Sequence, residues 1–466
     1  MIYMDGGVKD LTVAYIGGGS RGWAWGFMAD LAMDAQMQGL VRLYDIDREA
    51  AENNRRIGEK VSAHPDARAR WAYEVSPSLE SALSGAEIVV ISILPGTFAE
   101  MRGDVHLPEK YGVWQPVGDT TGPGGIVRAL RAIPMYSEIA RAVRQYSPEA
   151  WVISYTNPMS LCLAALYEAY PDIRAFGCCH EVFGAQKLLA AMLADKRGIQ
   201  GISRTEIKVN VLGINHFTWL SSASYRGLDL FPLFAEFCER YYDSGYVFAE
   251  EHRALNTSFV CRHRVKFDLF RRYGFIAAAG DRHLAEFMPP VYLKDPVAAE
   301  EWGFALTTVD WREEDLTRRL ARSRALIDGR EELSLAPSGE EGHLLIKALL
   351  GLGDLISNVI LPNRGQVENL PLGAMVETNA LFRRGEIRPV HAGSIPEGIL
   401  PLMALHVRNQ RTTLEAAIHA DYSLTLSALL NDPLMEGVSP ADADTLLREM
   451  LKNSSRFLPD WQGLEE

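Results

Sequence analysis

Long apolar runs are missing from this sequence. No run approaches the ~20 residues that a membrane-spanning helix requires. The first ten residues carry Asp5, Lys9 and Asp10 in place of the apolar stretch of a signal peptide. Internal repeats and low-complexity tracts are also missing. The sequence therefore predicts neither a membrane partner nor an export signal.

Cysteine and positive charge are both scarce. Five cysteines among 466 residues do not form a disulfide framework, and the odd number fits a reducing compartment. The chain has 47 lysines and arginines against 60 aspartates and glutamates, and its net charge of -13 argues against a nucleic-acid partner. A composition of 47% hydrophobic and 23% charged residues is ordinary for a soluble protein. We expect a cytoplasmic protein.

The first 200 residues show the pattern of an α/β domain. Short apolar runs rich in β-forming residues alternate with helical patterns, which is typical of a parallel sheet covered on both faces. The expected strands cover residues 11–16, 40–45, 88–93 and 151–155. We therefore predict a Rossmann-like, doubly wound parallel sheet over residues 1–200, with helices near 23–37 and 48–61.

A second lobe is expected because 466 residues exceed the size of one hydrophobic core. One more strand is expected over 207–215, after which the alternation fades and helical patterns dominate. The longest of these cover residues 231–250, 311–328 and 341–358. We predict a mainly helical α+β domain over 201–466 for substrate binding, catalysis and oligomerisation. No flexible linker marks the boundary, so the two lobes should share a large interface.

A glycine-rich turn follows the first strand. Residues 17–22 (GGGSRG) satisfy the G-x-G-x-x-G pattern between a strand and a helix, where backbone N–H groups can approach a pyrophosphate. The candidate cofactor-binding residues here are Gly17, Gly19, Ser20 and Gly22. In this setting the pattern predicts a bound dinucleotide.

Further cofactor contacts are expected at the next strand ends. Asp45 lies about 28 positions after Gly17, close to the usual spacing for an acid that binds the adenosine ribose, which favours NAD over NADP. An ordinary helix-capping acid is the alternative. Pro95 and Gly96 end the strand at 88–93. Asp119 lies in the loop 118–125 (GDTTGPGG), whose density of glycines favours a loop that passes close to a ligand over a plain surface loop.

Cys179 and His216 are candidate metal ligands. Each follows a strand-like segment, and a thiolate with an imidazole suits a divalent transition metal. Cys178 would point the opposite way on a strand, so only one of the two adjacent cysteines can face the site. Two protein ligands leave positions for water or substrate, which indicates a catalytic metal. The alternative is that both are buried core side chains. The remaining cysteines lack the paired spacing of a zinc site: Cys162, Cys238 and Cys261.

These motifs, in this order, resemble glycoside hydrolase family 4, the NAD- and metal-dependent glycosidases. The resemblance runs from the glycine turn through the 121–125 loop (TGPGG), Asn157-Pro158 and Cys179-His180 to Asn215-His216. It implies that NAD+ oxidises C3 of the sugar, that the C2 proton becomes acidic, and that the glycosidic oxygen leaves by elimination. Water then adds, and the hydride returns, so there is no net redox change.

The resemblance also implies roles for individual residues. Cys179 and His216 would hold Mn2+, although cobalt, nickel or iron would also suit such a pair. Asn157 and Asn215 would hold the sugar beside the nicotinamide. His180 would assist the departure at C1, or alternatively would only bind a sugar hydroxyl.

The base that removes the C2 proton is expected in the polar segment 280–287 (GDRHLAEF). Asp281 is the candidate, and Tyr273 is its rival because some relatives use a tyrosine. The alternative for this segment is a solvated helix start.

The sequence Cys179-His180-Glu181-Val182 resembles the α-galacturonidase branch of the family and makes a phosphorylated sugar improbable. A galacturonide, as in pectin fragments, needs a cation for its C6 carboxylate. Arg282 and His283 are the candidates for this role, and Arg262 or Arg264 are the alternatives.

Other functions remain open at this point. Within the family they are an α-glucuronidase or a neutral-sugar α-galactosidase or α-glucosidase. Outside it, an NAD-dependent hydroxy-acid dehydrogenase would accumulate NADH, and a non-catalytic NAD sensor would need no metal ligands. Relatives form homodimers or homotetramers, which is the expected assembly here.

Overall fold

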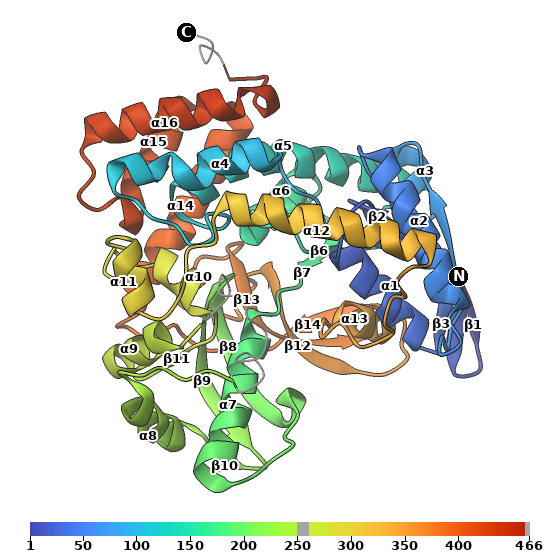
Figure 1. The fold of residues 1–466 in the computed structure, drawn as a ribbon, viewed down its shortest axis with the longest axis horizontal. Coiled ribbons are helices and arrows are strands. Elements are labelled where there is room, and N and C mark those ends of the chain that lie inside the picture. Colours follow the sequence, from blue (N-terminus) through green and yellow to red (C-terminus); the bar gives the residue numbers. More distant parts are fainter. Residues whose placement is uncertain (249–260, 462–466) are drawn as a thin grey trace.

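The computed structural model describes residues 1–248 and 261–461. Within these residues the chain forms two sheets flanked by helices (Figure 1). The larger sheet has ten strands in the order β4-β3-β2-β5-β6-β7-β12-β13-β14, with β1 paired to β2. These strands are β1 (Ile2–Met4), β2 (Gly7–Ile16), β3 (Met37–Tyr44), β4 (Trp71–Val75), β5 (Ile88–Ile91), β6 (Trp151–Ser154), β7 (Arg174–Gly177), β12 (Leu355–Pro362), β13 (Met375–Arg383) and β14 (Glu386–Pro389).

The strands from β4 to β7 are parallel and are covered on both faces. Every side chain of β5 is buried, which explains its continuous apolar sequence. Val89 and Ile91 pack in one core with α5 and α6, whereas Ile88 and Val90 pack in a second core with α1, α2 and α13. These helices are α1 (Trp23–Met33), α2 (Arg48–Ala63), α5 (Gly122–Tyr146), α6 (Met159–Ala169) and α13 (Gly342–Leu349). The predicted doubly wound, Rossmann-like sheet is confirmed.

The expected helix over 341–358 is wrong in its second half. Helix α13 ends at Leu349, and the chain then passes through Gly351 and Gly353, which both have positive φ. Strand β12 follows, rich in β-branched residues, and pairs antiparallel with β7 and β13. The large sheet thus takes strands from both sides of residue 200, and a domain boundary at that position stays a prediction.

The rest of the chain forms a small antiparallel sheet and many helices. This agrees with the prediction of a mainly helical α+β C-terminal part. The expected helix over 311–328 is α12 (Val309–Asp328), whereas the one expected over 231–250 ends at Tyr241, and its last two positions lie outside the described residues. The small sheet contains β8 (Ile207–Ile214), β9 (Phe217–Tyr225), β10 (Leu228–Asp229) and β11 (Ile276–Ala277).

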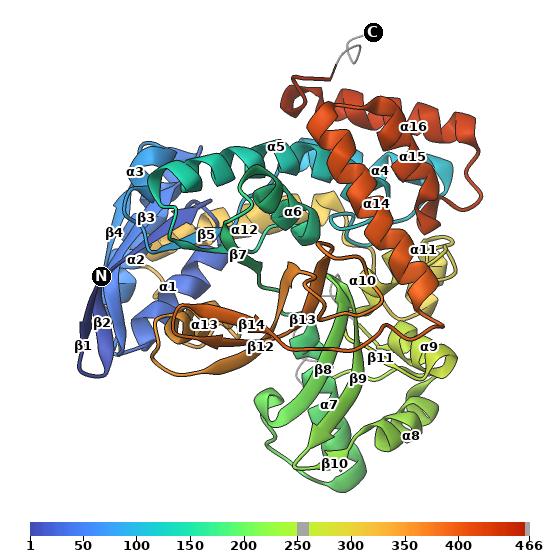
Figure 2. The same ribbon diagram turned by 180° about the vertical axis from the view of Figure 1, so that it is seen from behind.

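The remaining helices of more than five residues are α4 (Phe98–His106), α7 (Glu181–Arg197), α8 (Phe231–Tyr241), α9 (Arg264–Tyr273), α10 (Asp281–Glu286), α11 (Pro296–Glu301), α14 (Leu400–His419), α15 (Tyr422–Asn431) and α16 (Pro440–Ser454). In the part of the chain that the structure describes, no helix has the length and apolar character needed to span a bilayer. Figure 2 shows α14, α15 and α16 at one end of the molecule and the small sheet with α7 and α8 at another.

The two sheets are joined where β8 meets β13. The Val211 N–H donates to Asn379 Oδ1 across this junction at 2.8 Å. The carboxyl ends of the parallel strands point to the same region, which is the edge at which α/β sheets bind ligands. The candidate site lies there.

Candidate active site

The glycine turn between β2 and α1 fits a close backbone approach. Gly17 has φ of +89°, and a Cβ at this position would lie 2.0 Å from the Ser92 carbonyl oxygen. The Ser20 N–H donates to the Gly17 carbonyl and closes the turn. Helix α1 then starts without a side-chain cap and without an acidic residue in its first turn. Its positive end is therefore available to an anion such as a pyrophosphate.

Asp45 directly follows β3 and braces this turn. Its carboxylate accepts hydrogen bonds from the N–H groups of Gly19, at 2.8 Å, and Asp47, at 2.9 Å. The cap of α2 is Asp47 and not Asp45, because the side chain of Asp47 accepts from the Ala50 N–H. Pro95 and Gly96 precede α4, and the Pro95 carbonyl accepts from buried Arg131 at 3.2 Å.

Three side chains of types that can bind a metal converge beyond the ends of the strands. Asp119, His216 and His283 each offer a donor atom, and these atoms lie within 4.8 Å of one another. The two imidazole rings are 3.8 Å apart between centroids. His216 occupies the tight connection from β8 to β9 with φ of +63°, an unusual backbone for a non-glycine residue. The structure thus adds Asp119 and His283 to the neighbourhood of the predicted ligand His216.

The tautomer of His216 follows from its hydrogen bond. The Thr120 hydroxyl donates to Asp119 Oδ1 at 2.7 Å, so it accepts from His216 Nδ1 at 2.8 Å. The Nε2 atom of His216 then carries the free lone pair that a metal requires. Burial, reinforced by His283, lowers the pKa of His216 to about 3, which keeps the ring neutral.

The glycines of the 118–125 loop allow its backbone segments to pack closely against one another. A Cβ on Gly124 would lie 2.7 Å from the Gly118 carbonyl oxygen, and one on Gly125 would lie 2.5 Å from the Thr120 carbonyl carbon. The loop folds tightly back on itself before α5, and this compact turn presents Asp119 and Thr120 to His216.

Cys179 follows β7 on the face of the sheet opposite Cys178. The two side chains belong to different cores, as the alternation along a strand predicts. Burial and the nearby Glu377 and Glu181 raise the pKa of the Cys179 thiol well above its usual value. A neighbouring cation would be needed to hold it as a thiolate.

Asn358 and Glu377, which no motif predicted, lie beside Cys179 together with the predicted Asn215. Asn358 donates to the Cys179 carbonyl at 3.2 Å and to Glu377 at 2.8 Å. Asn215 donates to the other oxygen of Glu377 at 3.3 Å. Asn358 lies on β12 and Glu377 on β13. Strand β12, which the sequence predicted as a helix, therefore supplies part of the surroundings of Cys179.

His180 and Glu181 begin α7 and point to different neighbours. His180 Nδ1 lies 3.1 Å from Glu340 Oε1, and its side chain is 48% exposed. Glu181 accepts from the Gly280 N–H at 2.6 Å and lies 3.8 Å from His283 Nε2. Burial alone would raise the pKa of Glu181, but the surrounding histidines, His283 foremost, lower it to about 2.

Asp281 lies in a separate cluster with Cys261 and His263. Its carboxylate accepts from the Val265 and Lys266 N–H groups, both at 3.2 Å, and so caps the start of α9. Tyr273, at the other end of α9, packs its ring against Trp219. These contacts match a structural role for Asp281, and its assignment as the C2 base stays a prediction.

Several buried polar atoms near Asp119 have no partner within the described chain. They are Asn157 Oδ1, Asn215 Oδ1, His283 Nδ1, Glu286 Oε2 and Arg312 Nε. Asn157 Nδ2 donates to Asp119 at 3.2 Å, and Arg128 donates to the Asn157 carbonyl at 3.0 Å. Buried polar groups are normally satisfied, so this concentration marks a place prepared for a ligand.

Three arginines give this region positive charge. Arg128, Arg282 and Arg312 are electrostatic neighbours of Asp119. Arg282 donates to Thr307 Oγ1 at 2.5 Å. Arg312 comes from α12, and no local motif marks it as part of the site. Burial lowers the pKa of Arg312, and nearby Arg282 lowers it further.

The other predicted arginines are engaged elsewhere. Arg264 donates to the Tyr242 carbonyl at 3.1 Å and lies over the ring of Trp302. The side chain of Arg262 lies beside Gly245 and Gly303.

Glu286 is fully buried beside these arginines. Its Oε1 accepts from the N–H groups of Val117, at 2.7 Å, and Gly118, at 2.9 Å. Burial, together with the charge of Asp119, raises the pKa of Glu286 from 4.5 to about 8. Glu286 is therefore mainly neutral at pH 7, and it adds little negative charge to the site.

The raised pKa of Glu286 predicts how stability depends on pH. Between its unfolded pKa of 4.5 and its folded pKa of about 8, the folded state holds a proton that the unfolded state has lost. The free energy of unfolding should therefore fall as the pH rises through this window, by at most about 1.4 kcal/mol per pH unit from this group. Glu286→Gln should flatten that slope in urea unfolding at pH 5.5, 6.5 and 7.5. Glu314→Gln, at a side chain that is 72% exposed, is the matched control. Equal slopes for wild type and Glu286→Gln would contradict the assignment.

Comparisons with known proteins identify the family of this chain. Residues 12–195 match the model of the family 4 glycosyl hydrolases, and residues 211–435 match their C-terminal domain. An α-galacturonidase of Thermoanaerobacterium saccharolyticum is 56% identical over 463 residues, which cover 99% of each chain. An α-galacturonidase of Bacillus subtilis is 50% identical, over 96% of this chain and 98% of its own.

Solved structures share the fold of this chain. The candidate glucosidase lplD from Bacillus subtilis superposes with a TM-score of 0.91 at 50% identity, over 95% of this chain and all of its own. A 6-phospho-α-glucosidase from gut microorganisms, solved with NAD and Mn2+, shares the fold with a TM-score of 0.79 at 21% identity, over 97% of this chain and 100% of its own. The two family models together cover most of the chain, and the chain belongs to family 4 of the glycosyl hydrolases.

Proposed function

We propose that this protein is an NAD- and divalent-metal-dependent α-galacturonidase that releases galacturonic acid from α-linked oligogalacturonides. The observation that carries the proposal is the region around Asp119, which has Arg282 and Arg312 as electrostatic neighbours and contains the unsatisfied Asn157 Oδ1 and His283 Nδ1. The α-galacturonidases that match this chain along its full length support the same substrate. A cytoplasmic location and a homodimer or homotetramer complete the proposal.

The residues present fit an NAD molecule. The uncapped start of α1 and the turn from Gly17 to Gly22 suit a pyrophosphate, and Asp45 lies beside Gly19. When bound, NAD+ would supply reversible removal of hydride from C3 of the sugar. Pro95 and Gly96 would border the cofactor from the end of β5.

The residues also fit a divalent metal. His216 presents a neutral ring with Nε2 free, and Cys179 needs a cation to ionise. We assign these two as ligands, and Mn2+ is the proposed ion. When bound, it would supply polarisation of the C3 carbonyl. Asp119 and His283 are close enough to His216 to complete its coordination or to hold bound water.

The sugar would be oriented by the unsatisfied groups of the site. Asn157 and Asn215 would accept from its hydroxyls, because their Oδ1 atoms have no protein donor. Arg282 and Arg312 would bind the C6 carboxylate, for which the planar guanidinium is the geometric match. His180 would donate its proton to the departing oxygen at C1. Asp281, or Tyr273 in its place, would take the C2 proton.

The test is hydrolysis of digalacturonic acid in D2O with NAD+, Mn2+ and a thiol. Galacturonate that carries deuterium at C2, without net NADH, supports both the substrate and the elimination route. Hydrolysis without deuterium at C2 would retain the substrate and reject the route. No hydrolysis would reject the proposal in favour of a neutral α-galactoside or an α-glucuronide, and accumulation of NADH would indicate a dehydrogenase.

The hydrogen bond that fixes the His216 tautomer leads to a prediction. Thr120→Val keeps the volume of the side chain but removes the oxygen that accepts from Nδ1. The ring can then turn or change tautomer, and we expect Mn2+ to bind about 10- to 100-fold more weakly, measured by isothermal titration calorimetry. Thr445→Val, on α16, is the control because its hydroxyl bonds only within that helix. Unchanged Mn2+ affinity in Thr120→Val would show that Thr120 does not position His216.

A further inference from the structure

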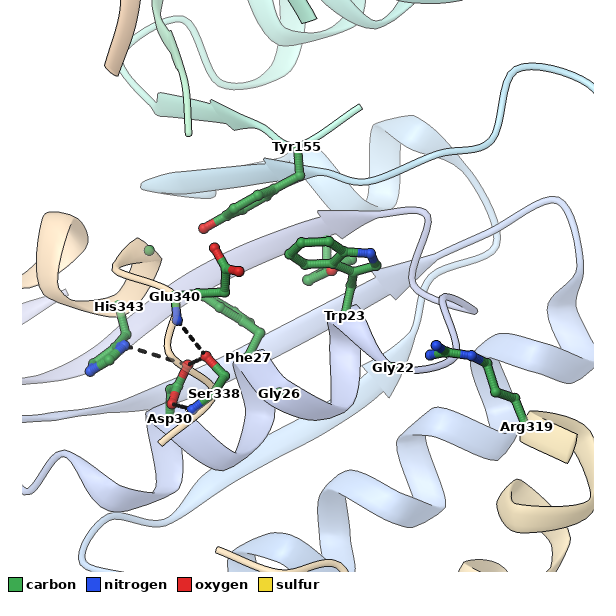
Figure 3. A pocket seen from close by; sticks show the side chains of 12 residues that line it. Gly22, Trp23, Gly26, Phe27, Asp30, Tyr155, Arg319, Ser338, Glu340 and His343 are labelled. Atoms are coloured by element: carbon green, nitrogen blue, oxygen red, sulfur yellow. Dashed lines mark hydrogen bonds and ion pairs between the residues drawn. The ribbon is translucent and has the colours of Figure 1, made fainter. Parts of the chain in front are cut away.

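A pocket of about 360 Å³ lies beside the first turns of α1. One wall is Gly22 with the part of α1 that extends to Asp30, and another is the segment 338–343 that leads into α13. Tyr155, at the end of β6, closes it from the side of the large sheet (Figure 3). Its volume is at the small end of the ~300–1,000 Å³ of ligand pockets, which suits a single sugar residue.

The pocket adjoins His180. The indole ring of Trp23 lies 5.8 Å from the His180 ring and 5.9 Å from the Tyr155 ring, between centroids. Glu340, which lines the pocket, lies 3.1 Å from His180 Nδ1. Because His180 also follows Cys179 directly in the chain, it connects the proposed metal site to this pocket. A group that leaves from C1 toward His180 would depart into it.

The lining has the chemistry of a sugar subsite. Trp23 is 44% exposed and presents a flat apolar ring, whose electron-rich face attracts the C–H groups of a pyranose. Glu340 Oε2 is buried without a hydrogen-bond partner in the described chain, and buried His343 Nδ1 makes no hydrogen bond there but lies 3.6 Å from Asp30 Oδ2 (Figure 3). They would accept from, or donate to, sugar hydroxyls.

The charges of the lining indicate how an acidic sugar would lie. Asp30 is satisfied by the N–H and hydroxyl of Ser338, at 2.9 and 2.5 Å, and Glu340 is paired with His180. Arg319, at the end of the pocket near Gly22, is the lining side chain with a permanent positive charge. Its Nε pairs with Asp315 at 2.5 Å and its Nη1 donates to the Arg21 carbonyl at 2.8 Å, so these two contacts fix the guanidinium at that end and leave Nη2 for a ligand. A carboxylate would therefore point toward Arg319.

We propose that this pocket binds the leaving sugar, the second galacturonate residue of the substrate, with its ring on Trp23 and its carboxylate toward Arg319. The inference rests on the proposed function, because it takes a galacturonide as the substrate. It adds a site that recognises the part of the substrate beyond the scissile bond.

The experiment compares two substrates in the holoenzyme with NAD+ and Mn2+. Digalacturonic acid has a second sugar, and methyl α-galacturonide does not. In Trp23→Ala the ratio of kcat/KM for the first to that for the second should fall about 10- to 30-fold. Trp23→Phe should restore part of the ratio, and Arg319→Gln should lower it independently. Leu372→Ala, at a side chain that is 77% exposed, and Arg318→Gln, on the same helix as Arg319, are the controls.

The outcomes separate this inference from the function on which it rests. If both substrates lost the same factor, so that the ratio stayed at the wild-type value, the pocket would not bind the leaving sugar. A matching fall in NAD+ affinity would then assign it to the cofactor. A wild-type enzyme that cleaved neither galacturonide would overturn the proposed function and this inference with it.

Discussion

Cys179→Ala should lower the rate of galacturonide hydrolysis by about 10³-fold or more. A metal that polarises a carbonyl contributes several kcal/mol to the transition state, and each 1.36 kcal/mol is a factor of ten in rate. Cys179 is the thiol after β7 that lies near Glu181 and Glu377, and burial leaves it dependent on a cation for ionisation. Without the thiol, the affinity for Mn2+ should fall by more than the ~10–100-fold typical of residues that only support ligands.

Cys178→Ala provides a matched control. It removes the same atom one residue away, but from the core on the opposite face of the sheet. Both variants lose a buried thiol, so thermal unfolding should report similar costs for the two, whereas only Cys179→Ala should lose Mn2+ in calorimetric titration. Full Mn2+ affinity in Cys179→Ala would remove Cys179 from the ligand set and leave His216 with Asp119 and His283 as the candidates.

The fold was predictable where local pattern and tertiary context agree. Strands such as β5 are apolar throughout because both faces are covered, and the glycine turn after β2 is fixed by its contact with Ser92. Strand β12 was misassigned because it follows α13 closely and continues its apolar sequence. Its strand conformation comes from pairing with β7 and β13, which are distant in sequence. Periodicity cannot report such a partner.

The candidate site also contains some residues that the sequence predicted and others that it did not. Asn157, Cys179 and His216 follow strands or precede a tight connection, so their positions in the sequence predicted their place at the edge of the sheets. Glu377 and Asn358 reach Cys179 from β12 and β13, and no local motif marks them. Asp281 stands in a conspicuous polar segment, and its carboxylate also caps α9, a contact that depends on how the two helices pack; its role as the base stays a prediction.

Arg312→Gln should reduce the preference for a uronate over a neutral sugar by about 100-fold or more. Removal of one partner of a buried charge pair costs about 2–5 kcal/mol, which corresponds to roughly 30- to 5,000-fold. Arg312 Nε is buried without a hydrogen-bond partner in the described chain, and the electrostatic neighbours of Arg312 include Asp119, Arg282 and Glu286. A carboxylate would satisfy that atom and relieve the repulsion between the two arginines. The measurement is the ratio of kcat/KM for digalacturonic acid to that for the corresponding α-linked digalactoside, which has no carboxylate.

The ratio distinguishes recognition from a structural role. If Arg312 only stabilised Asp119, both substrates would lose the same factor and the affinity for Mn2+ would fall with them. Arg312→Lys keeps the charge but not the planar pair of donors, so it should recover only part of the preference. Arg318→Gln, on the same helix with a side chain that is 56% exposed, should leave the ratio unchanged.

The protonation state of Glu286 should make this preference depend on pH. An ionised carboxylate beside Arg312 would compete with the substrate for the same guanidinium, whereas a neutral Glu286 does not. Uronate preference should therefore decline as the pH rises past about 8, the pKa of Glu286, and this decline should be absent in Glu286→Gln.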